Sequence, residues 1–540
     1  MTPAASRRVL SVPRLLWGVG LLLIGVGLAV LYFRQSRIAL FNSDGGAMVL
    51  QAWTMSHGNP LLRGWWIADV SFYTTELPEY MLVEVFRGVR PEVVHICGGV
   101  TYALTVLLAA LAARGGNKGR AGIVRALVAG GIMLAPGIFG GTQVFLENPD
   151  HAGTAVPVLL LLLLLDRAPE RWYVPAAACV LLAWIQVADK LVLAVATVPI
   201  AAVALVRLGL LAKRRRSRAD LGYEALLAVA AVASVPLGAA AELVMRSLGG
   251  YQMRALPPLL ASGSRILANV DVLGQTILTL FGANGQGTGY GYLEPITLFH
   301  MIGLVMAIAA FAVGAVTFFS GRQDRVTQIV VVGAAALLVA GIFTTELPSL
   351  ANAHEFAILL PFGAVLAGRV LPPLLPAGWD RAGWRPGRVL LPVLGLWLAC
   401  SLTALCYAGT LAPPTPTNEA LANWLVSHGL REGLAGYWEA ASTTVDSGGK
   451  VLVAPVNLNG RTVQEWESSA AWYNPGTHWA NFIVASTATT RPRVALSVSV
   501  ERRIFGTPAR EYHVAGWVVM VYRYNLLPKL NGRSFPSATG

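Results

Sequence analysis

The side chains of this sequence that could do chemistry are carboxylates and imidazoles that stand at the ends of long apolar runs. Carboxylates and imidazoles transfer protons in enzymes and bind divalent cations through oxygen and nitrogen. Ionisable groups beside apolar helices are costly unless they serve a cavity or one another. We therefore expect one water-filled chamber that collects Asp44, Glu76, Glu79, Glu147, Asp150, His151, Asp189, Lys190, Glu346, His354 and Glu355.

Several of these carboxylates also have a structural interpretation. Aspartate is a favoured N-cap, so Asp44 could cap a helix that begins near Gly45, and Asp150 could cap the apolar run that follows it. Glu76 and Glu79 could belong to a solvated loop face. The sequence leaves the structural and the functional interpretation open for each of them.

Other polar and Gly-rich features are predicted to be structural. Asp189 and Lys190 separate two apolar runs, so they mark a tight turn or an ion pair at a helix break. His300 is flanked by apolar residues and is predicted to be a buried histidine with satisfied hydrogen bonds. The glycine-rich stretch 282–291 lacks the Lys-Ser/Thr and the preceding strand of a P-loop. It is predicted to be a flexible loop over the chamber.

The composition is that of an integral membrane protein. The 540 residues are 55% hydrophobic and 13% charged, with a mean hydropathy of +0.59, whereas a soluble domain is about a quarter charged. The net charge is +13, but the basic residues stand in short clusters between apolar runs. That is the pattern of cytoplasmic loops, so we expect membrane and no nucleic acid as a partner. The cysteines also lie in apolar runs without metal spacing, and they are predicted to be small buried hydrophobic side chains: Cys97, Cys179, Cys400 and Cys406.

Eleven apolar runs predict about eleven transmembrane helices. The first run has no small-residue cleavage site close behind it, so it is predicted to be an uncleaved helix rather than a signal peptide. Every second loop is basic, which predicts a cytoplasmic N-terminus and an extracytoplasmic C-terminal segment. The runs are 15–33, 93–113, 122–142, 152–166, 173–189, 191–211, 222–245, 295–319, 327–345, 355–375 and 389–411. The basic loops are 114–121, 167–172, 212–221, 320–326 and 376–388.

The predicted fold is mainly α: a polytopic membrane helix bundle over residues 1–411 with a small extracytoplasmic α/β domain over 412–540. The first outer loop, 34–92, is aromatic and is expected to hold one or two interfacial helices. A second long outer loop, 246–294, contains an amphipathic helix candidate at 265–281. The C-terminal segment is predicted to open with a helix at 418–428 capped by Thr417, and to continue with strands at 450–456, 479–485, 493–500 and 514–523.

This arrangement resembles the GT-C superfamily of membrane glycosyltransferases, which includes protein O-mannosyltransferases, aminoarabinose transferases, oligosaccharyltransferases and actinobacterial arabinosyltransferases. The features that carry the resemblance are Asp44 after the first span, Glu147 and Asp150 in the second outer loop, the long first outer loop, the span count and the outer C-terminal domain. The family's usual adjacent acidic pair is replaced here by Ser43-Asp44. The Ala-, Leu- and Arg-rich composition is similar to that of actinobacterial proteins from high-GC genomes.

The resemblance implies transfer of a sugar, with inversion, from a polyprenyl-phosphate donor to a glycan, lipid or protein acceptor of the cell envelope. It implies Asp44 as the general base that takes the acceptor proton. Lys190 and Arg254 are the cations expected to stabilise the leaving phosphate. The cofactor is unassigned; some family members use a divalent metal ion. The side chains expected to bind substrate, or in part such a metal, are Glu76, Glu79, Glu147, Asp150, His151, His354 and Glu355.

Two other functions compete with glycosyl transfer. A lipid transporter or flippase would have inverted repeats and charges near the bilayer midplane, whereas the charges here gather at helix ends. A non-catalytic envelope assembly or scaffold protein would use the outer domain to bind a partner, and its carboxylates would be structural. The aromatics of that domain suit sugar stacking, a small core or membrane contact equally: Trp424, Tyr437, Trp438, Trp466, Trp472, Tyr473 and Trp479.

Overall fold

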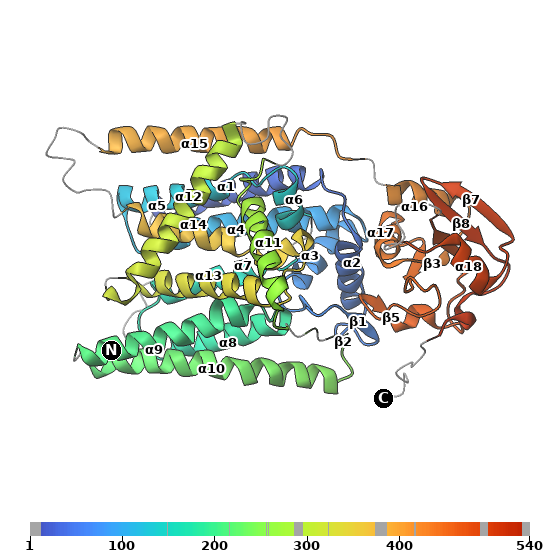
Figure 1. The fold of residues 1–540 in the computed structure, drawn as a ribbon, viewed down its shortest axis with the longest axis horizontal. Helices are drawn as coiled ribbons and strands as arrows, with labels where there is room; N and C mark the ends of the chain where they lie inside the picture. Colours follow the sequence, from blue (N-terminus) through green and yellow to red (C-terminus); the bar gives the residue numbers. More distant parts are fainter. Residues whose placement is uncertain are drawn as a thin grey trace, which may run out of the picture.

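The protein consists of a helix bundle and a C-terminal unit that contains a five-stranded sheet (Figure 1). The computed structural model describes residues 12–147, 150–214, 217–254, 256, 259–285, 295–321, 323–372, 386–414, 417–486 and 495–531. Most of the long helices run alongside one another, and the C-terminal unit lies beyond one end of the bundle (Figure 1). Most of the predicted loop 282–291 falls outside the described residues.

Every predicted apolar run contains a helix, but only some of these helices are long. Within the described residues, seven helices are long and apolar enough to cross a membrane, or eight if η4 and α14, which meet at 49°, form one span. The long ones are α1 (Val12–Ser36), α4 (Glu92–Arg114), η1 with α9 (Leu193–Thr197 and Val198–Lys213), α10 (Arg218–Ser247), α12 (Pro295–Val316), α13 (Arg325–Phe343) and α15 (Pro386–Ala408). The short ones are α5 (Gly119–Met133), α7 (Ala155–Arg167), α8 (Tyr173–Ala188) and η4 with α14 (Leu350–Phe356 and Leu359–Val370).

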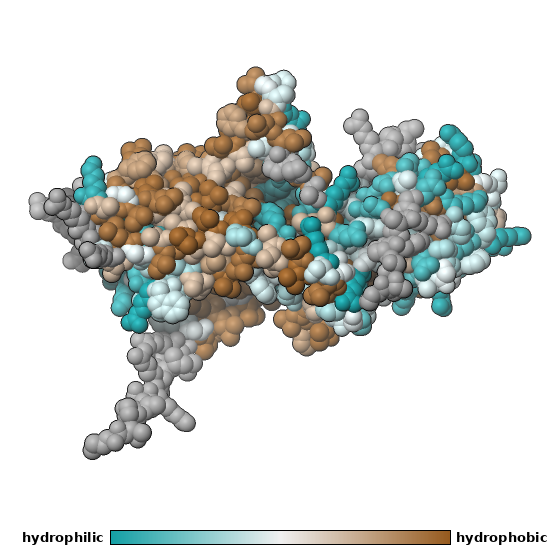
Figure 2. Space-filling model, turned by 90° about the horizontal axis from the view of Figure 1, so that it is seen from below, coloured by the Kyte–Doolittle hydropathy of each residue, from teal (hydrophilic) through white to brown (hydrophobic). Residues whose placement is uncertain are grey.

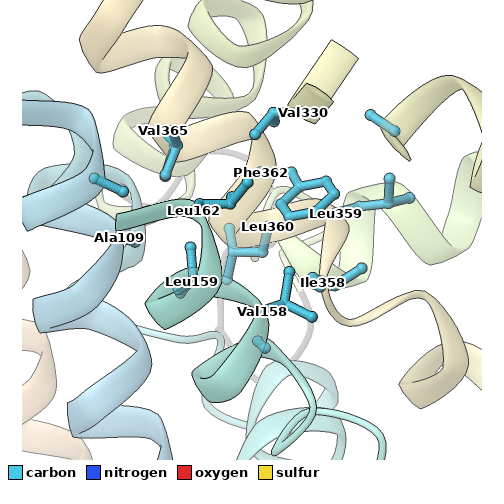
Figure 3. Packing of buried hydrophobic residues seen from close by; sticks show 14 of the residues in the cluster. Ala109, Val158, Leu159, Leu162, Val330, Ile358, Leu359, Leu360, Phe362 and Val365 are labelled. Carbon is cyan, nitrogen blue, oxygen red and sulfur yellow. The ribbon is translucent and has the colours of Figure 1, made fainter. Parts of the chain in front are cut away.

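The short helix α7 lies in the interior of the bundle. Its residues Val158, Leu159 and Leu162 are fully buried and pack among side chains of α14, including Leu360 and Phe362 (Figure 3). Because neighbouring helices cover most of α7, leaving Leu160 exposed, it does not need the length that a fully lipid-exposed helix requires.

Apolar side chains cover much of the bundle surface, and polar ones dominate the C-terminal unit (Figure 2). On α1, for example, Leu22 and Leu23 are 65% and 67% exposed. A soluble monomer rarely exposes an apolar surface this continuous, so this surface is suited to lipid.

The long loop after α1 and the later polar loop contain the predicted helices. The first loop folds into α2 (Ser43–Ser56) and α3 (Leu77–Arg87), with the strand β1 (Trp65–Ile67) between them. The amphipathic candidate forms α11 (Gly263–Leu280). His300 is buried as predicted. Its ring nitrogens also have hydrogen-bond partners, since they lie 2.7 and 3.0 Å from the carbonyl oxygens of Ala135 and Gly282.

The C-terminal unit is an α/β structure around a five-stranded sheet of order β4-β3-β6-β8-β7. Strands β4, β3 and β6 are parallel to one another. Strand β8 is antiparallel to both of its neighbours, β6 and β7. The elements are α16 (Thr417–Ser427), β3 (Glu432–Ala435), α17 (Tyr437–Asp446), β4 (Leu452–Pro455), β5 (Ser468–Ser469), β6 (Phe482–Ala485), α18 (Val498–Phe505), β7 (Arg510–Val514) and β8 (Trp517–Val521).

Three of the four predicted strands are confirmed, as β4, β6 and β8. The strand predicted at 493–500 is wrong, since the described part of this segment leads into helix α18. Glu501 and Phe505 are both buried and lie four residues apart, on one helical face. The alternating valines and serines of this segment therefore do not reflect the two-residue repeat of a strand.

A second, small sheet joins three distant parts of the chain at the end of the bundle. Strand β1 pairs parallel with β2 (Gln252–Met253) and antiparallel with β5. In this way the first loop, the second loop and the C-terminal unit share one hydrogen-bonded junction.

Helices α2 and α17 make a second junction through small side chains. A Cβ atom added at Gly46 would lie 3.0 Å from the carbonyl carbon of Ala441 and 3.1 Å from the amide nitrogen of Ser442. Only glycine lets the two helix backbones approach this closely without a shift.

The variant Gly46→Val should therefore destabilise the contact between α2 and α17. Forcing extra carbon into a packed interface costs about 1–3 kcal/mol. We expect a lower temperature of unfolding in detergent and faster proteolysis within the C-terminal unit. The matched control is Gly209→Val in α9, where an added Cβ meets nothing within 4 Å. Equal protease resistance of the two variants would contradict the assignment of a tight α2–α17 contact.

Candidate functional site

A cavity of about 910 Å³ lies between the end of the bundle and the C-terminal unit. We call it the chamber. Its walls come from α2, the segment after β1, the turn at 150–151, the loops around η4, the first residues of α17 and the segment 456–467. Its described lining contains no lysine or arginine, and six carboxylates: Asp44, Asp69, Asp150, Glu346, Glu355 and Glu467.

Asp44 lies in the first turn of α2 and is partly exposed to the chamber. It is not the helix cap, because the side chain of Asn42 accepts the hydrogen bond from the Gly45 amide. An anion in the first turn is stabilised by the helix dipole. Burial nevertheless raises the pKa of Asp44 to about 6; a hydrogen bond from Tyr437 lowers this pKa, and the charge of Asp150 raises it.

The C-terminal unit reaches Asp44 through Tyr437, the first residue of α17. The Tyr437 hydroxyl makes a short hydrogen bond with Oδ1 of Asp44 and lies 2.6 Å from Oε2 of Glu467. Glu467 is 6% exposed and directly precedes strand β5. The pairing of β5 with β1 therefore positions Glu467 at the chamber wall.

His151 and Asp189 form an ion pair on another part of the wall. The His151 Nδ1 lies 3.1 Å from Oδ2 of Asp189, which also accepts a hydrogen bond from Thr154 at 2.5 Å. The other carboxylate oxygen accepts from the amide of Leu191 at 2.8 Å. Burial opposes the charged ring, but the charge and hydrogen bond of Asp189 raise the pKa of His151 to about 10. His151 is therefore an imidazolium ion at neutral pH, and it is a positive charge in an otherwise acidic lining.

Asp189 stays ionised for the same reason. Burial alone would raise its pKa, but the His151 charge and the hydrogen bonds lower it below its ordinary value. The predicted ion pair between Asp189 and Lys190 is therefore wrong. Asp189 pairs with His151, and Lys190 makes a short ion pair with Glu242.

His354 stacks on His151 with ring centroids 5.6 Å apart and an angle of 18° between the rings. Its Nε2 lies 3.8 Å from Oδ2 of Asp150. Glu355 accepts a hydrogen bond from Asn352 at 3.1 Å. The chamber thus brings together Asp44, Asp150, His151, His354 and Glu355, which the sequence predicts to share a site.

Backbone strain is concentrated at the chamber. Among the described residues, five that are not glycine have a positive φ, and three of these line it: Phe72 (φ 49°), His151 (φ 38°) and Glu467 (φ 45°). Left-handed backbone costs bulky residues free energy, and it persists where the surrounding structure enforces it, often at functional sites.

Glu76 and Glu79 do not line the chamber, and they are not on a solvated loop face. Glu76 is 2% exposed; the Thr75 hydroxyl donates to one oxygen, and the other has no partner among the described residues. Burial raises the pKa of Glu76 well above its ordinary value. Glu79 accepts a hydrogen bond from Thr101 at 2.7 Å, and burial raises its pKa to about 7.

The remaining predicted residues also have defined places. Burial, together with the charges of Asp44 and Asp150, raises the pKa of Glu147 to about 8, so this carboxyl belongs to the same electrostatic cluster although it does not line the chamber. Asp150 does not cap α7, which begins after Thr154. Neither Lys190 nor Arg254 is among the residues described as lining the chamber.

The side chains do not fit the divalent metal that the family resemblance suggests. Among the described residues, no group of three or more histidine, cysteine, aspartate or glutamate side chains has the arrangement of a metal site. We therefore derive no step through a metal.

Sequence reasoning missed Asp69 and Glu467 and gave Tyr437 no role at Asp44. Tyr437 and Glu467 belong to a segment that also brings Trp438 and Trp466 to the chamber wall. The density of aromatics there was a usable signal, because exposed aromatics beside carboxylates suit sugar rings as well as a core.

The variant Asp189→Asn should lower the pKa of His151 well below 10, because burial is then opposed only by the weaker charges of Asp150 and Glu355. Thr154 can still donate to the asparagine carbonyl, so the fold should be retained. NMR of ¹⁵N-histidine-labelled protein in nanodiscs at pH 8 should show a neutral His151 ring in the variant and an imidazolium in the wild type. Asp271→Asn, at an exposed position of α11, is the control. An imidazolium that survives in Asp189→Asn would contradict this account of the ion pair.

No family model matches the chain, and no curated protein matches it either.

Proposed function

We propose that the protein is a membrane glycosyltransferase of the GT-C type. In this proposal it transfers a sugar from a polyprenyl-phosphate donor to an acceptor hydroxyl on the extracytoplasmic face. The observation that carries the proposal is the chamber itself: a partly exposed carboxylate, Asp44, and an imidazolium, His151, line one cavity at the ends of apolar helices. The lipid tail of the donor would lie along the bundle, and its phosphate and sugar would enter the chamber.

Asp44 is the proposed general base. Its Oδ1 is held by Tyr437, and its Oδ2 accepts no hydrogen bond from the described residues. In the reaction the acceptor O–H proton moves to Asp44, and the acceptor oxygen forms a bond to the anomeric carbon. The bond from that carbon to the phosphate oxygen breaks, and its electron pair leaves with the phosphate. Attack from the face opposite the leaving group inverts the anomeric centre.

His151 is the proposed cation for the leaving phosphate. A leaving phosphate gains negative charge, which a fixed positive group stabilises most effectively in a site shielded from water. Lys190 was expected in this role, but it is paired with Glu242. His151 lines the chamber and is held in its charged form by Asp189.

We further propose that the bundle crosses the membrane about eleven times, with the N-terminus in the cytoplasm and the chamber outside. The support is the alternation of basic loops together with helices at all eleven apolar runs. The short helices would complete the remaining spans; most of α7 is covered by protein, whereas α8 exposes Val180 and Trp184.

The variant Asp44→Asn should reduce sugar transfer from a polyprenyl-phosphate donor by about 10²–10⁴-fold, the usual contribution of a positioned base. Asparagine keeps the hydrogen bond with Tyr437, so thermal unfolding should change little. The assay is transfer of radiolabelled sugar by purified protein in nanodiscs, with Asp271→Asn as the control. Full activity in Asp44→Asn would remove this residue from the mechanism. Movement of intact donor across liposomes without transfer would favour a flippase.

The dependence of kcat/KM on pH should rise through about 6 and fall near 10. Asp44 must be ionised to accept a proton, and its pKa is about 6. His151 must be protonated to assist the leaving phosphate, and its pKa is about 10. A profile that is flat between pH 5 and 7 would contradict the role of Asp44.

A further inference from the structure

We propose that the C-terminal unit holds Asp44 in its reactive form through a chain of two hydrogen bonds. Glu467 is the neutral acid and donates to the oxygen of Tyr437, and Tyr437 donates to ionised Asp44. This inference rests on the proposed function only for its catalytic consequence. Tyr437 and Glu467 are positioning residues, and the C-terminal unit is a structural part of the active site.

The argument begins with a count of protons. A tyrosine hydroxyl has one hydrogen to donate, yet Tyr437 lies within hydrogen-bond distance of a carboxylate oxygen on each side. With both carboxylates ionised, one of these contacts would be a repulsion between oxygen lone pairs. Two hydrogen bonds form only when one of the two carboxyls carries a proton and donates it to the tyrosine oxygen.

The surroundings decide which carboxyl carries that proton. Glu467 is 6% exposed, and its direct hydrogen-bond partner is neutral. Asp44 is partly exposed to the chamber and stands in the first turn of a helix, where the dipole favours an anion. Burial raises the pKa of Glu467 well above its ordinary value, and the charge of Asp44 raises it further, whereas the pKa of Asp44 reaches only about 6.

Other charged groups around Asp44 favour the same assignment. Asp150 and Glu147 approach it from the turn before α7, and Asp69 approaches Glu467 from the end of β1. Several carboxyls this close cannot all be ionised. A proton on Glu467, the most buried member of the pair, removes one negative charge from beside the proposed base without neutralising the base itself.

Infrared spectroscopy tests the protonation directly, without any assay of activity. Full-length protein in nanodiscs at pH 7 should show a carbonyl band of protonated carboxyls that loses intensity in Glu467→Gln; the part that remains comes from other buried carboxyls with a raised pKa, such as Glu76 and Glu147. The control is Glu465→Gln, an exposed glutamate two residues away, which should keep the full intensity of the band. A band of equal intensity in wild type and Glu467→Gln would overturn the proposal.

Activity tests the positioning role. Tyr437→Phe removes a hydrogen bond to ionised Asp44, so the acidic limb of kcat/KM should move above pH 6 by about one unit. Glu467→Gln still donates to the Tyr437 oxygen and is neutral, so its acidic limb should stay in place. Movement of that limb to lower pH in Glu467→Gln would mean that Glu467 is ionised in the wild type.

The two proposals fail separately. Absence of sugar transfer by the wild type would defeat the proposed function, while the infrared band would still decide the state of Glu467. Sugar transfer with an unmoved acidic limb in Tyr437→Phe would defeat the positioning role alone, provided that Tyr407→Phe, at an exposed position of α15, behaves like the wild type.

Discussion

The close contact between α2 and α17 is the constraint on which the chamber depends. Gly46 allows the two helix backbones to touch, and this contact places Tyr437, at the start of α17, against Asp44, at the start of α2. Both helices therefore direct their N-terminal ends at one point. Two residues almost four hundred positions apart in the chain become direct partners because neither helix has bulk at its contact face.

Charge balance is the second constraint on the chamber. Six carboxylates face it, and the described lining offers no lysine or arginine against them. The structure accommodates this by keeping some carboxyls neutral through burial and by fixing a protonated histidine on the wall. Such a chamber would repel a free phosphate anion from most of its surface. The position of His151 then determines where an anionic group can be tolerated.

Much of the architecture could be predicted from the sequence, because apolar periodicity and basic loops report on helices and their order. Topology was enough to bring Asp44, Asp150, His151 and His354 together. It could not predict that Glu76 turns inward, because that depends on the space left by Gly153, which has no side chain beside the Glu76 carboxyl. The positions of Tyr437 and Glu467 beside Asp44 could not be predicted for another reason. The pairing of strand β5 with β1 positions Glu467, but β5 has two residues, too few to show any period in the sequence.

The small sheet of β2, β1 and β5 has a consequence for biosynthesis. Its strands come from residues 65–67, 252–253 and 468–469, so the last strand leaves the ribosome long after the first two. Until then the wall formed by residues 437–467 is missing and the chamber is open on that side. A nascent chain with all its helices inserted would thus still lack part of the chamber wall, and the chamber would be completed only at the end of synthesis.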